Sequence, residues 1–311
     1  MLRVNNLSVC TSSNKKYLLR DVSFYLDDGD SLGIIGKSGD GKSTLAKALL
    51  QIYDYDVIYD SGEILYNNVP FSNKLRGKVF SLMFQNPNTY LNPLMKVGKQ
   101  ISEMLTYHYK ENKKVAKEKA IDLMKKVGLP EPEKLYNYYP YELSGGMQQR
   151  VCLCISLICK AKVLIMDEST SYLDKESEKE ILKLIKEFQK EYGFILIMIS
   201  HDFKLIYSMC NKIAIMRKGQ MIEFGNKDEI ILKPVHPYTV ELLCNYLSFY
   251  KDIEAFECPL INTELEECPN IVNISKTHYV RSFYLDHNSV KINYPKNIES
   301  IKEEIYESFR N

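Results

Sequence analysis

The sequence predicts an α/β fold in which a parallel sheet carries a phosphate-binding loop. A glycine-rich loop at Gly36–Ser43 lies between the apolar run Leu32–Ile35 and a helical pattern at Thr44–Gln51. Further along the chain, apolar strands at 163–166 and 194–199 are separated by a segment long enough for a helix. Strands that alternate with helices of this length are typical of a three-layer α/β core.

The glycine-rich loop fits the pattern G-x-x-x-x-G-K-[ST], which cradles phosphate groups. A strand, a loop and a helix in this order aim several backbone N–H groups and a helix N-terminus at one point, which attracts phosphate. We expect Lys42 to reach the β- and γ-phosphates and the Ser43 hydroxyl to ligate Mg²⁺. A glycine-serine turn that matches by accident is the alternative. The residues expected to bind the nucleotide are Gly36, Lys37, Ser38, Gly39, Asp40, Gly41, Lys42, Ser43 and Thr44.

Short apolar stretches before the loop, at 2–9 and 22–26, predict a small N-terminal sheet, with a further strand at 61–66. Between about 86 and 160 the chain becomes helical. Helices are predicted at 97–109 and at 113–127, where Val115, Leu123 and Val127 are among the apolar positions. Strands resume at 163. We therefore expect a helical subdomain inserted into the sheet. Residues 213–216 and 221–224 predict a final hairpin.

Composition limits the class of protein. The chain has 311 residues, of which 45% are apolar and 26% charged, and a net charge of +1, which gives no support for nucleic acid binding. No apolar run approaches the roughly 20 residues that span a bilayer. The N-terminus lacks the layout of a secretory signal, so we expect a cytoplasmic protein. Its eight cysteines form no C-x-x-C pair and are expected to be reduced thiols.

Two strand ends carry further candidate residues. Gln85 follows a strand at 79–84, and its neutral amide oxygen can bind Mg²⁺ or an attacking water; a surface role is the alternative. Asp167 and Glu168 close the strand at 163–166, where successive side chains point to opposite sides. We expect Asp167 to hold Mg²⁺ and Glu168 to orient or deprotonate the water that attacks the γ-phosphate. A solvated acidic pair is the alternative.

A second anion-binding helix N-terminus is predicted at Ser144, which is followed by Gly145 and Gly146. A simple N-cap role for Ser144 is compatible with this pattern. His201 ends the apolar strand at 194–200, and its imidazole there can donate a hydrogen bond to a γ-phosphate. A structural histidine is the alternative.

These motifs follow one another along the chain in an order that resembles the ATP-binding cassette (ABC) ATPases. The resemblance covers residues 1 to about 245. It implies a RecA-like parallel sheet, an N-terminal antiparallel β-subdomain and an inserted helical subdomain at about 86–160, followed by a small C-terminal extension at 246–311. It also implies ATP and Mg²⁺ as ligands. The catalytic residues would be Glu168, His201, Gln85 and Lys42, and the Mg²⁺ ligands Ser43, Gln85 and Asp167.

In that family two nucleotide-binding domains work head to tail, and each ATP lies between the phosphate loop of one and the Leu-Ser-Gly-Gly helix of the other. The resemblance implies that the contacts to the partner's ATP come from Ser144, Gly145, Gly146 and Gln148. Tyr17 is the aromatic residue available to stack on the adenine.

The short sequence motifs at 84–87, 91–93 and 236–239 are similar to motifs of the peptide and nickel importers of this family. This implies an ATPase subunit bound to two separate permease subunits at the cytoplasmic face of the membrane, served by an extracellular solute-binding protein. We expect oligopeptides or dipeptides as the solute and a second, different cassette as the partner. A nickel or metal-chelate importer is the alternative, and a soluble non-transport ATPase is a more distant one.

Members of the peptide branch often end in a four-cysteine segment that holds an iron–sulfur cluster. Here Cys258 and Cys268 match that segment, whereas Ser282 stands where a fourth cysteine is expected. Two thiolates do not make the usual four-ligand site, so we predict no cluster. Helical spacing at 298–309 predicts a terminal amphipathic helix.

Overall fold

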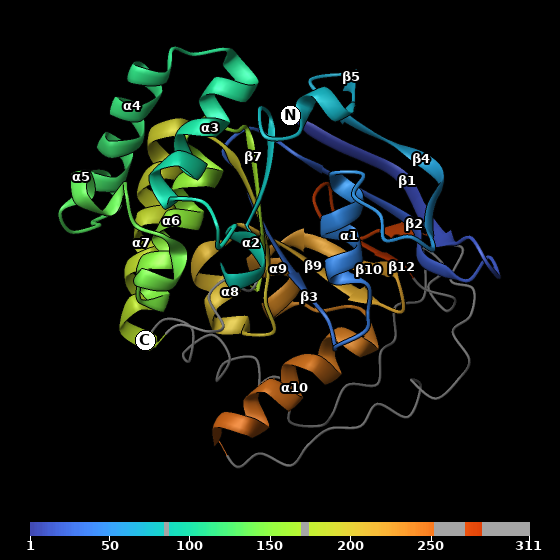
Figure 1. Cartoon of the computed structure of the whole chain (residues 1–311). Coiled ribbons are helices and arrows are strands. Elements are labelled where there is room, and N and C mark those ends of the chain that lie inside the picture. The colour runs from blue at the N-terminus through green and yellow to red at the C-terminus, as the bar shows by residue number, and fades with distance from the viewer. Residues whose placement is uncertain (84–86, 169–173, 252–270, 282–311) are drawn as a thin grey trace.

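The computed structural model describes residues 1–83, 87–168, 174–251 and 271–281 (Figure 1). Eight of the described strands form one sheet, in the order β11-β12-β10-β9-β3-β8-β7-β6. Strands β9, β3, β8, β7 and β6 are parallel to one another, and β10, β12 and β11 extend the sheet in antiparallel fashion. The strands are β3 (Ser31–Ile35), β6 (Phe80–Met83), β7 (Val163–Asp167), β8 (Ile195–Ile199), β9 (Lys212–Arg217), β10 (Gln220–Asn226), β11 (Ile271–Asn273) and β12 (Tyr279–Arg281).

The two faces of this sheet belong to two separate apolar cores. In β7, Val163 and Ile165 enter one core, whereas Leu164 and Met166 enter the other. Strand β8 alternates in the same way. A strand buried on both faces reads as a continuous apolar run, which explains why the central strands could be located in the sequence. The three-layer α/β core is confirmed.

The N-terminal part of the chain covers one face of the main sheet. A second sheet, antiparallel and ordered β2-β1-β4-β5, packs there together with helix α1. This arrangement confirms the predicted N-terminal β-subdomain. Its elements are β1 (Leu2–Thr11), β2 (Tyr17–Leu26), α1 (Lys42–Leu49), β4 (Val57–Tyr66), β5 (Val69–Pro70) and the 3₁₀ turn η1 (Asn73–Leu75).

Helices between β6 and β7 form the inserted subdomain, on the opposite side of the molecule from the β1–β4 sheet (Figure 1). On α4, Leu123 is buried as expected and Val127 is buried just beyond the helix, but Val115 is 36% exposed because Ala116 and Ala120 occupy the inward positions. The elements are α2 (Pro87–Tyr90), α3 (Val97–Tyr109), α4 (Lys113–Lys126), α5 (Pro132–Leu135), η2 (Pro140–Glu142) and α6 (Gly145–Leu157).

The C-terminal half adds two helices that each connect two strands and two consecutive helices after β10. They are α7 (Lys175–Tyr192), α8 (Phe203–Met209), α9 (Lys227–Leu232) and α10 (Pro237–Lys251). The boundary predicted after residue 245 lies inside α10, and β12 pairs with β10. The described part of the C-terminal extension is therefore continuous with the main sheet. The predicted helix at 298–309 lies outside the described residues.

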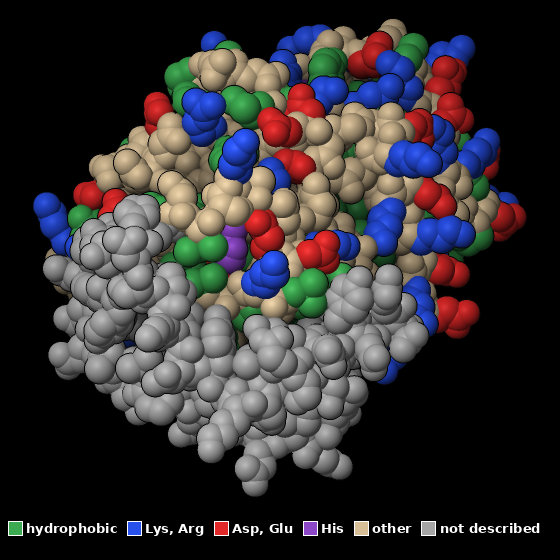
Figure 2. Space-filling view, turned by 180° about the vertical axis from the view of Figure 1, so that it is seen from behind, with side chains coloured by type: hydrophobic (Ala, Val, Ile, Leu, Met, Phe, Trp, Pro, Cys, Tyr) green, Lys and Arg blue, Asp and Glu red, His purple; other side chains and the backbone are tan. Residues whose placement is uncertain are grey.

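Charges of both signs are interspersed over the surface seen from behind (Figure 2). Among the described residues, no helix is both long and apolar enough to cross a membrane. The six cysteines that the structure describes are buried free thiols, and burial raises the pKa of Cys152 to about 12. These thiols are packing groups rather than reactive ones.

Candidate functional site

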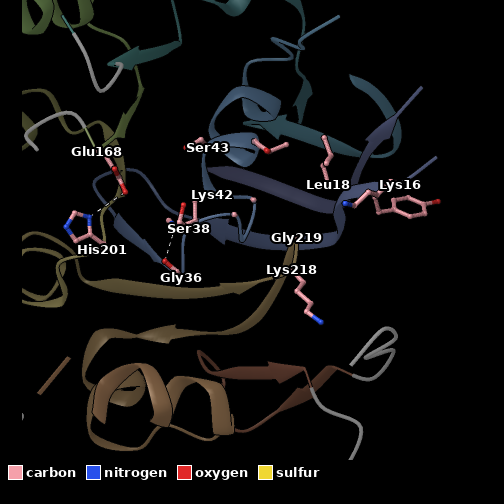
Figure 3. A pocket seen from close by; sticks show the side chains of 14 residues that line it. Lys16, Leu18, Gly36, Ser38, Lys42, Ser43, Glu168, His201, Lys218 and Gly219 are labelled. Atoms are coloured by element: carbon pink, nitrogen blue, oxygen red, sulfur yellow. Dashed lines mark hydrogen bonds and ion pairs between the residues drawn. The ribbon is translucent and has the colours of Figure 1, made fainter. Parts of the chain in front are cut away.

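The phosphate loop joins β3 to α1, as the sequence predicts. Its turn depends on glycine, because Gly39 and Gly41 have φ values of +87° and +93°, where side chains are strained. The Lys42 ammonium is buried and donates to the carbonyl oxygens of Gly36 and Lys37, both at 2.9 Å. These two hydrogen bonds hold the Lys42 ammonium against the loop (Figure 3). A phosphate group that binds in the loop can replace the carbonyl oxygens as its hydrogen-bond partner.

A cavity of about 910 Å³ opens over the loop. Its walls come from the start of β2, the phosphate loop with the start of α1, the ends of β7 and β8, and the turn between β9 and β10 (Figure 3). Segments far apart in the sequence thus meet at one site. The lining residues are Lys16, Tyr17, Leu18, Gly36, Ser38, Gly39, Gly41, Lys42, Ser43, Thr44, Glu168, His201, Lys218 and Gly219.

Asp167 ends β7 beside the first turn of α1. The Ser43 hydroxyl donates to its Oδ1 at 3.1 Å. Burial raises the pKa of the Asp167 carboxyl, while the hydrogen bond from Ser43 opposes that shift. A hydroxyl and a carboxylate placed side by side are the oxygen ligands that Mg²⁺ takes in nucleotide sites, so the two residues present fit the predicted metal site.

Glu168 follows in a sparsely populated backbone conformation, with φ at +44°. Its N–H donates to the carbonyl oxygen of Ile199 at 3.0 Å, which fixes this residue against the end of β8. His201 lies just beyond β8, and its Nδ1 is 3.6 Å from Oε1 of Glu168 (Figure 3). Backbone strain of this kind persists where the surrounding structure over-determines it, and functional sites are common examples. The Glu168 carboxylate and the His201 imidazole lie side by side in the lining of the cavity.

Tyr17, the first residue of β2, also lines the cavity. Its side chain is 46% exposed, and its hydroxyl donates to Asp60 at 3.2 Å, which raises the pKa of the phenol. The Arg20 guanidinium lies 5.7 Å from the centre of the Tyr17 ring. An exposed ring at this place can take the base of a nucleotide, and its stacking role stays a prediction.

The Ser144 helix lies elsewhere on the surface. Ser144 caps α6 by accepting a hydrogen bond from the Met147 N–H at 3.4 Å. Ser144 and Gly145 are exposed, and neither belongs to the cavity lining. Gln148 differs, because it is buried and its amide donates to the carbonyl oxygens of Pro140 and Leu143. The exposed Ser144 and Gly145 can contact a second chain, whereas the Gln148 side chain is already hydrogen-bonded within its own domain.

Two residues of the phosphate loop direct their side chains away from the cavity. The Asp40 carboxylate accepts from the Lys37 N–H at 2.7 Å, and the Lys37 ammonium pairs with Glu241 at 2.7 Å. Neither residue belongs to the lining of the cavity. Gln85 lies outside the described residues, as do Cys258, Cys268 and Ser282, so their predicted roles stay predictions.

Sequence reasoning missed the turn formed by Lys218 and Gly219. The hairpin itself was predicted, but its position beside the loop depends on β9 pairing with β3, which no local pattern shows. A Cβ on Gly219 would lie 2.4 Å from the Leu18 carbonyl oxygen. Glycine is required there because the turn packs tightly on β2.

This fold and site define a phosphate-loop nucleotide-binding domain with a carboxylate and a histidine at the ends of two neighbouring strands. The model of the ABC transporter family matches residues 19–171. The chain is 35% identical to the oligopeptide transport ATP-binding protein OppD of Bacillus subtilis, over 99% of this chain and 96% of that protein. It is 32% identical to the dipeptide transport ATP-binding protein DppD of Lactococcus lactis, over 96% and 95%.

Among solved structures, cbiO1 from Clostridium perfringens, a part of the ABC transporter complex cbiONQ, superposes with a TM-score of 0.65 at 28% identity. That match covers 81% of this chain and 98% of cbiO1. The chain therefore belongs to the ABC transporter family and is an ATPase subunit of this family. The resemblance seen in the sequence is confirmed.

Proposed function

We propose that this chain is the ATP-hydrolysing subunit of an importer for oligopeptides or dipeptides. The observation that carries the proposal is the convergence of Lys42, Ser43, Glu168 and His201 on one cavity of about 910 Å³. The similarity to peptide transport proteins along almost the whole chain supports peptides over nickel as the solute.

Hydrolysis in this site depends on positioning and on charge stabilisation. The backbone N–H groups of the loop and the Lys42 ammonium bind the phosphates, and the Glu168 carboxylate orients and deprotonates the attacking water. His201 holds that carboxylate and donates to the γ-phosphate. Ser43, Asp167 and Gln85 would hold Mg²⁺, which would neutralise charge on the phosphate oxygens when bound.

The site of one chain is half of a working site in this proposal. Ser144 and Gly145 are exposed and lie outside the cavity, which favours contact with the nucleotide of a second cassette. We infer that the partner is a different cassette subunit. Mass spectrometry of the purified transporter should find two distinct cassettes in equal amounts; one cassette species alone would indicate a homodimer.

Two permease subunits would dock on the helical subdomain. A pocket of about 350 Å³ there is lined by side chains of α2, of the loop between α2 and α3, and of α3 and α6. Its lining includes Tyr90, Met95, Met104 and Tyr107. In this proposal a cytoplasmic loop of a permease binds this surface, and the chain lies at the cytoplasmic face of the membrane.

The test is transport by the assembled complex. The full chain is co-purified with its membrane subunits, reconstituted into vesicles with the solute-binding protein, and supplied with ATP on the cassette side. Uptake of a labelled oligopeptide is expected with the wild-type chain and is expected to disappear with Glu168→Gln. Uptake of nickel without uptake of peptide would replace this proposal with the metal importer.

A further inference from the structure

The first turn of α10 rests on the phosphate loop. The Tyr238 hydroxyl donates to Oδ2 of Asp40 at 2.7 Å, and Glu241 accepts from the Lys37 ammonium at 2.7 Å. Partners in these two bonds are 198 and 204 residues apart in the sequence. A helix at the end of the cassette thus contacts two side chains of the loop directly.

Asp40 is the residue on which these contacts converge. Its carboxylate also accepts the Lys37 N–H at 2.7 Å and the Lys218 N–H at 3.0 Å, and its carbonyl oxygen accepts the Gly219 N–H at 3.0 Å. Only 8% of Asp40 is exposed. Donors from the loop, from the β9–β10 turn and from α10 therefore hold one carboxylate beneath the loop.

The direction of this carboxylate matters because the loop binds anions. A negative charge free to turn toward the cavity would repel phosphate, and in a partly buried site such repulsion is weakly screened. The loop itself contributes little packing, since Gly39 and Gly41 have no side chains. The hydrogen bonds to Asp40 therefore determine the direction in which its carboxylate points.

Tyr238 is built to supply the hydrogen bond from α10. It is 2% exposed, and burial raises the pKa of its phenol, as does the hydrogen bond to Asp40, so the hydroxyl stays protonated and donates. The Lys37 ammonium and the Arg217 guanidinium lie 5.5 and 4.9 Å from the ring centre. These contacts fix the ring next to the loop.

The start of α10 is itself anchored to the main sheet. Glu223 of β10 is fully buried and accepts hydrogen bonds from the Val235 and His236 N–H groups and from the Thr239 hydroxyl. Its carboxylate also contacts Nε2 of His278 at 2.8 Å. Tyr238 lies between these anchored residues, so its hydroxyl is held at a fixed position relative to the sheet.

We propose that Tyr238 is a positioning residue for nucleotide binding: its hydroxyl holds the Asp40 carboxylate under the phosphate loop and so sets the affinity of the site for ATP. The inference rests on the proposed ATP-binding function. The start of α10 follows the motifs of the nucleotide site in the sequence. Through Tyr238 it would directly determine the geometry of that site.

The test compares the full wild-type chain with Tyr238→Phe by displacement of a fluorescent ATP analogue. Loss of a hydrogen bond to a charged group predicts an increase in the Kd for ATP of about tenfold. Tyr207→Phe is the matched control, because its hydroxyl also donates to a carboxylate, that of Asp228, but at the surface. The control should bind ATP as the wild type does.

A merely structural role for Tyr238 would lower the melting temperature of Tyr238→Phe and leave its Kd for ATP within twofold of wild type, which overturns the proposal. A second variant isolates the charge. Adding Asp40→Asn to Tyr238→Phe should recover most of the lost affinity, because a neutral amide does not repel phosphate. No recovery would also overturn the proposal. Failure of the wild-type chain to bind ATP would instead reject the proposed function.

Discussion

Nδ1 of His201 lies 3.6 Å from Oε1 of Glu168, and the two residues follow neighbouring parallel strands. The His201 side chain is 73% exposed and that of Glu168 is 28% exposed, so the pair faces the cavity and solvent rather than the core. A histidine that served only the packing of the domain would be buried. In the function proposed above, this pair would provide hydrolysis of ATP in addition to binding.

His201→Ala should therefore reduce the kcat of ATP hydrolysis by about a hundredfold or more, the usual contribution of a positioned proton-transfer group. The KM for ATP should change by less than threefold, because the phosphate loop is untouched. Steady-state phosphate release at several ATP concentrations separates the two constants. A kcat within threefold of wild type would assign His201 to structure.

Lys42→Ala should weaken ATP binding. The ammonium is buried between two loop carbonyls, and its removal takes away the charge that the phosphates would meet. We expect a loss of at least tenfold in affinity, as for charge-assisted hydrogen bonds. Lys47→Ala is the matched control on the same helix, since Lys47 forms a surface ion pair with Asp54. Equal affinities for the two variants would contradict the role of Lys42.

Asp167→Asn should raise the thermal stability of the metal-free chain at neutral pH. Burial raises the pKa of Asp167, so the folded state binds this proton more tightly than the unfolded state does. The stability that the folded state gains from this tighter proton binding is fully present below the pKa of the unfolded state, about 4. It is lost as the pH rises through the raised pKa of Asp167 in the folded state. The difference in melting temperature between variant and wild type should therefore be largest at pH 7 and shrink toward pH 4.

The same variant should lose the increase in ATP affinity that Mg²⁺ gives the wild type, because a neutral amide is a weaker ligand than a carboxylate. Titrations of the ATP analogue with and without Mg²⁺ measure this increase. A variant less stable than wild type at pH 7, or one with an unchanged response to Mg²⁺, would argue against a strained metal-binding carboxylate.

Glu223→Ala should destabilise the chain by about 3 to 5 kcal/mol, because it leaves several buried donors and His278 without their partner. Urea denaturation measures the free energy of unfolding. Glu63→Ala provides the comparison, since Glu63 is exposed and accepts one hydrogen bond from Asn5. A loss below about 1 kcal/mol for Glu223→Ala would mean that this network does not anchor α10.

Much of the fold could be predicted because the central strands are buried on both faces and read as continuous apolar runs. The helix at 97–109 was predicted with its observed bounds, since its ends coincide with changes in apolar periodicity. On α4, however, Val115 is exposed and alanines take the inward positions, because side-chain size alone does not fix the phase of a short helix.

The site was predicted as a set of separate strand ends and one loop. Parallel strands place their carboxyl ends at one edge, which explains why Lys42, Asp167, Glu168 and His201 could be grouped from the sequence. The bond between Tyr238 and Asp40 could not, because it joins residues 198 positions apart through the packing of α10. The one local sign of this bond is that Asp40 is an acidic residue inside an anion-binding loop.

The most direct test of the ATPase assignment is hydrolysis by Glu168→Gln in the purified complex of the full-length chain with its partner cassette and permease subunits, supplied with Mg²⁺ and ATP. We expect the variant to bind ATP with wild-type affinity and to release phosphate at least a hundredfold more slowly, because its neutral amide cannot accept the proton of the attacking water. Phosphate release at the wild-type rate would show that Glu168 does not activate the attacking water.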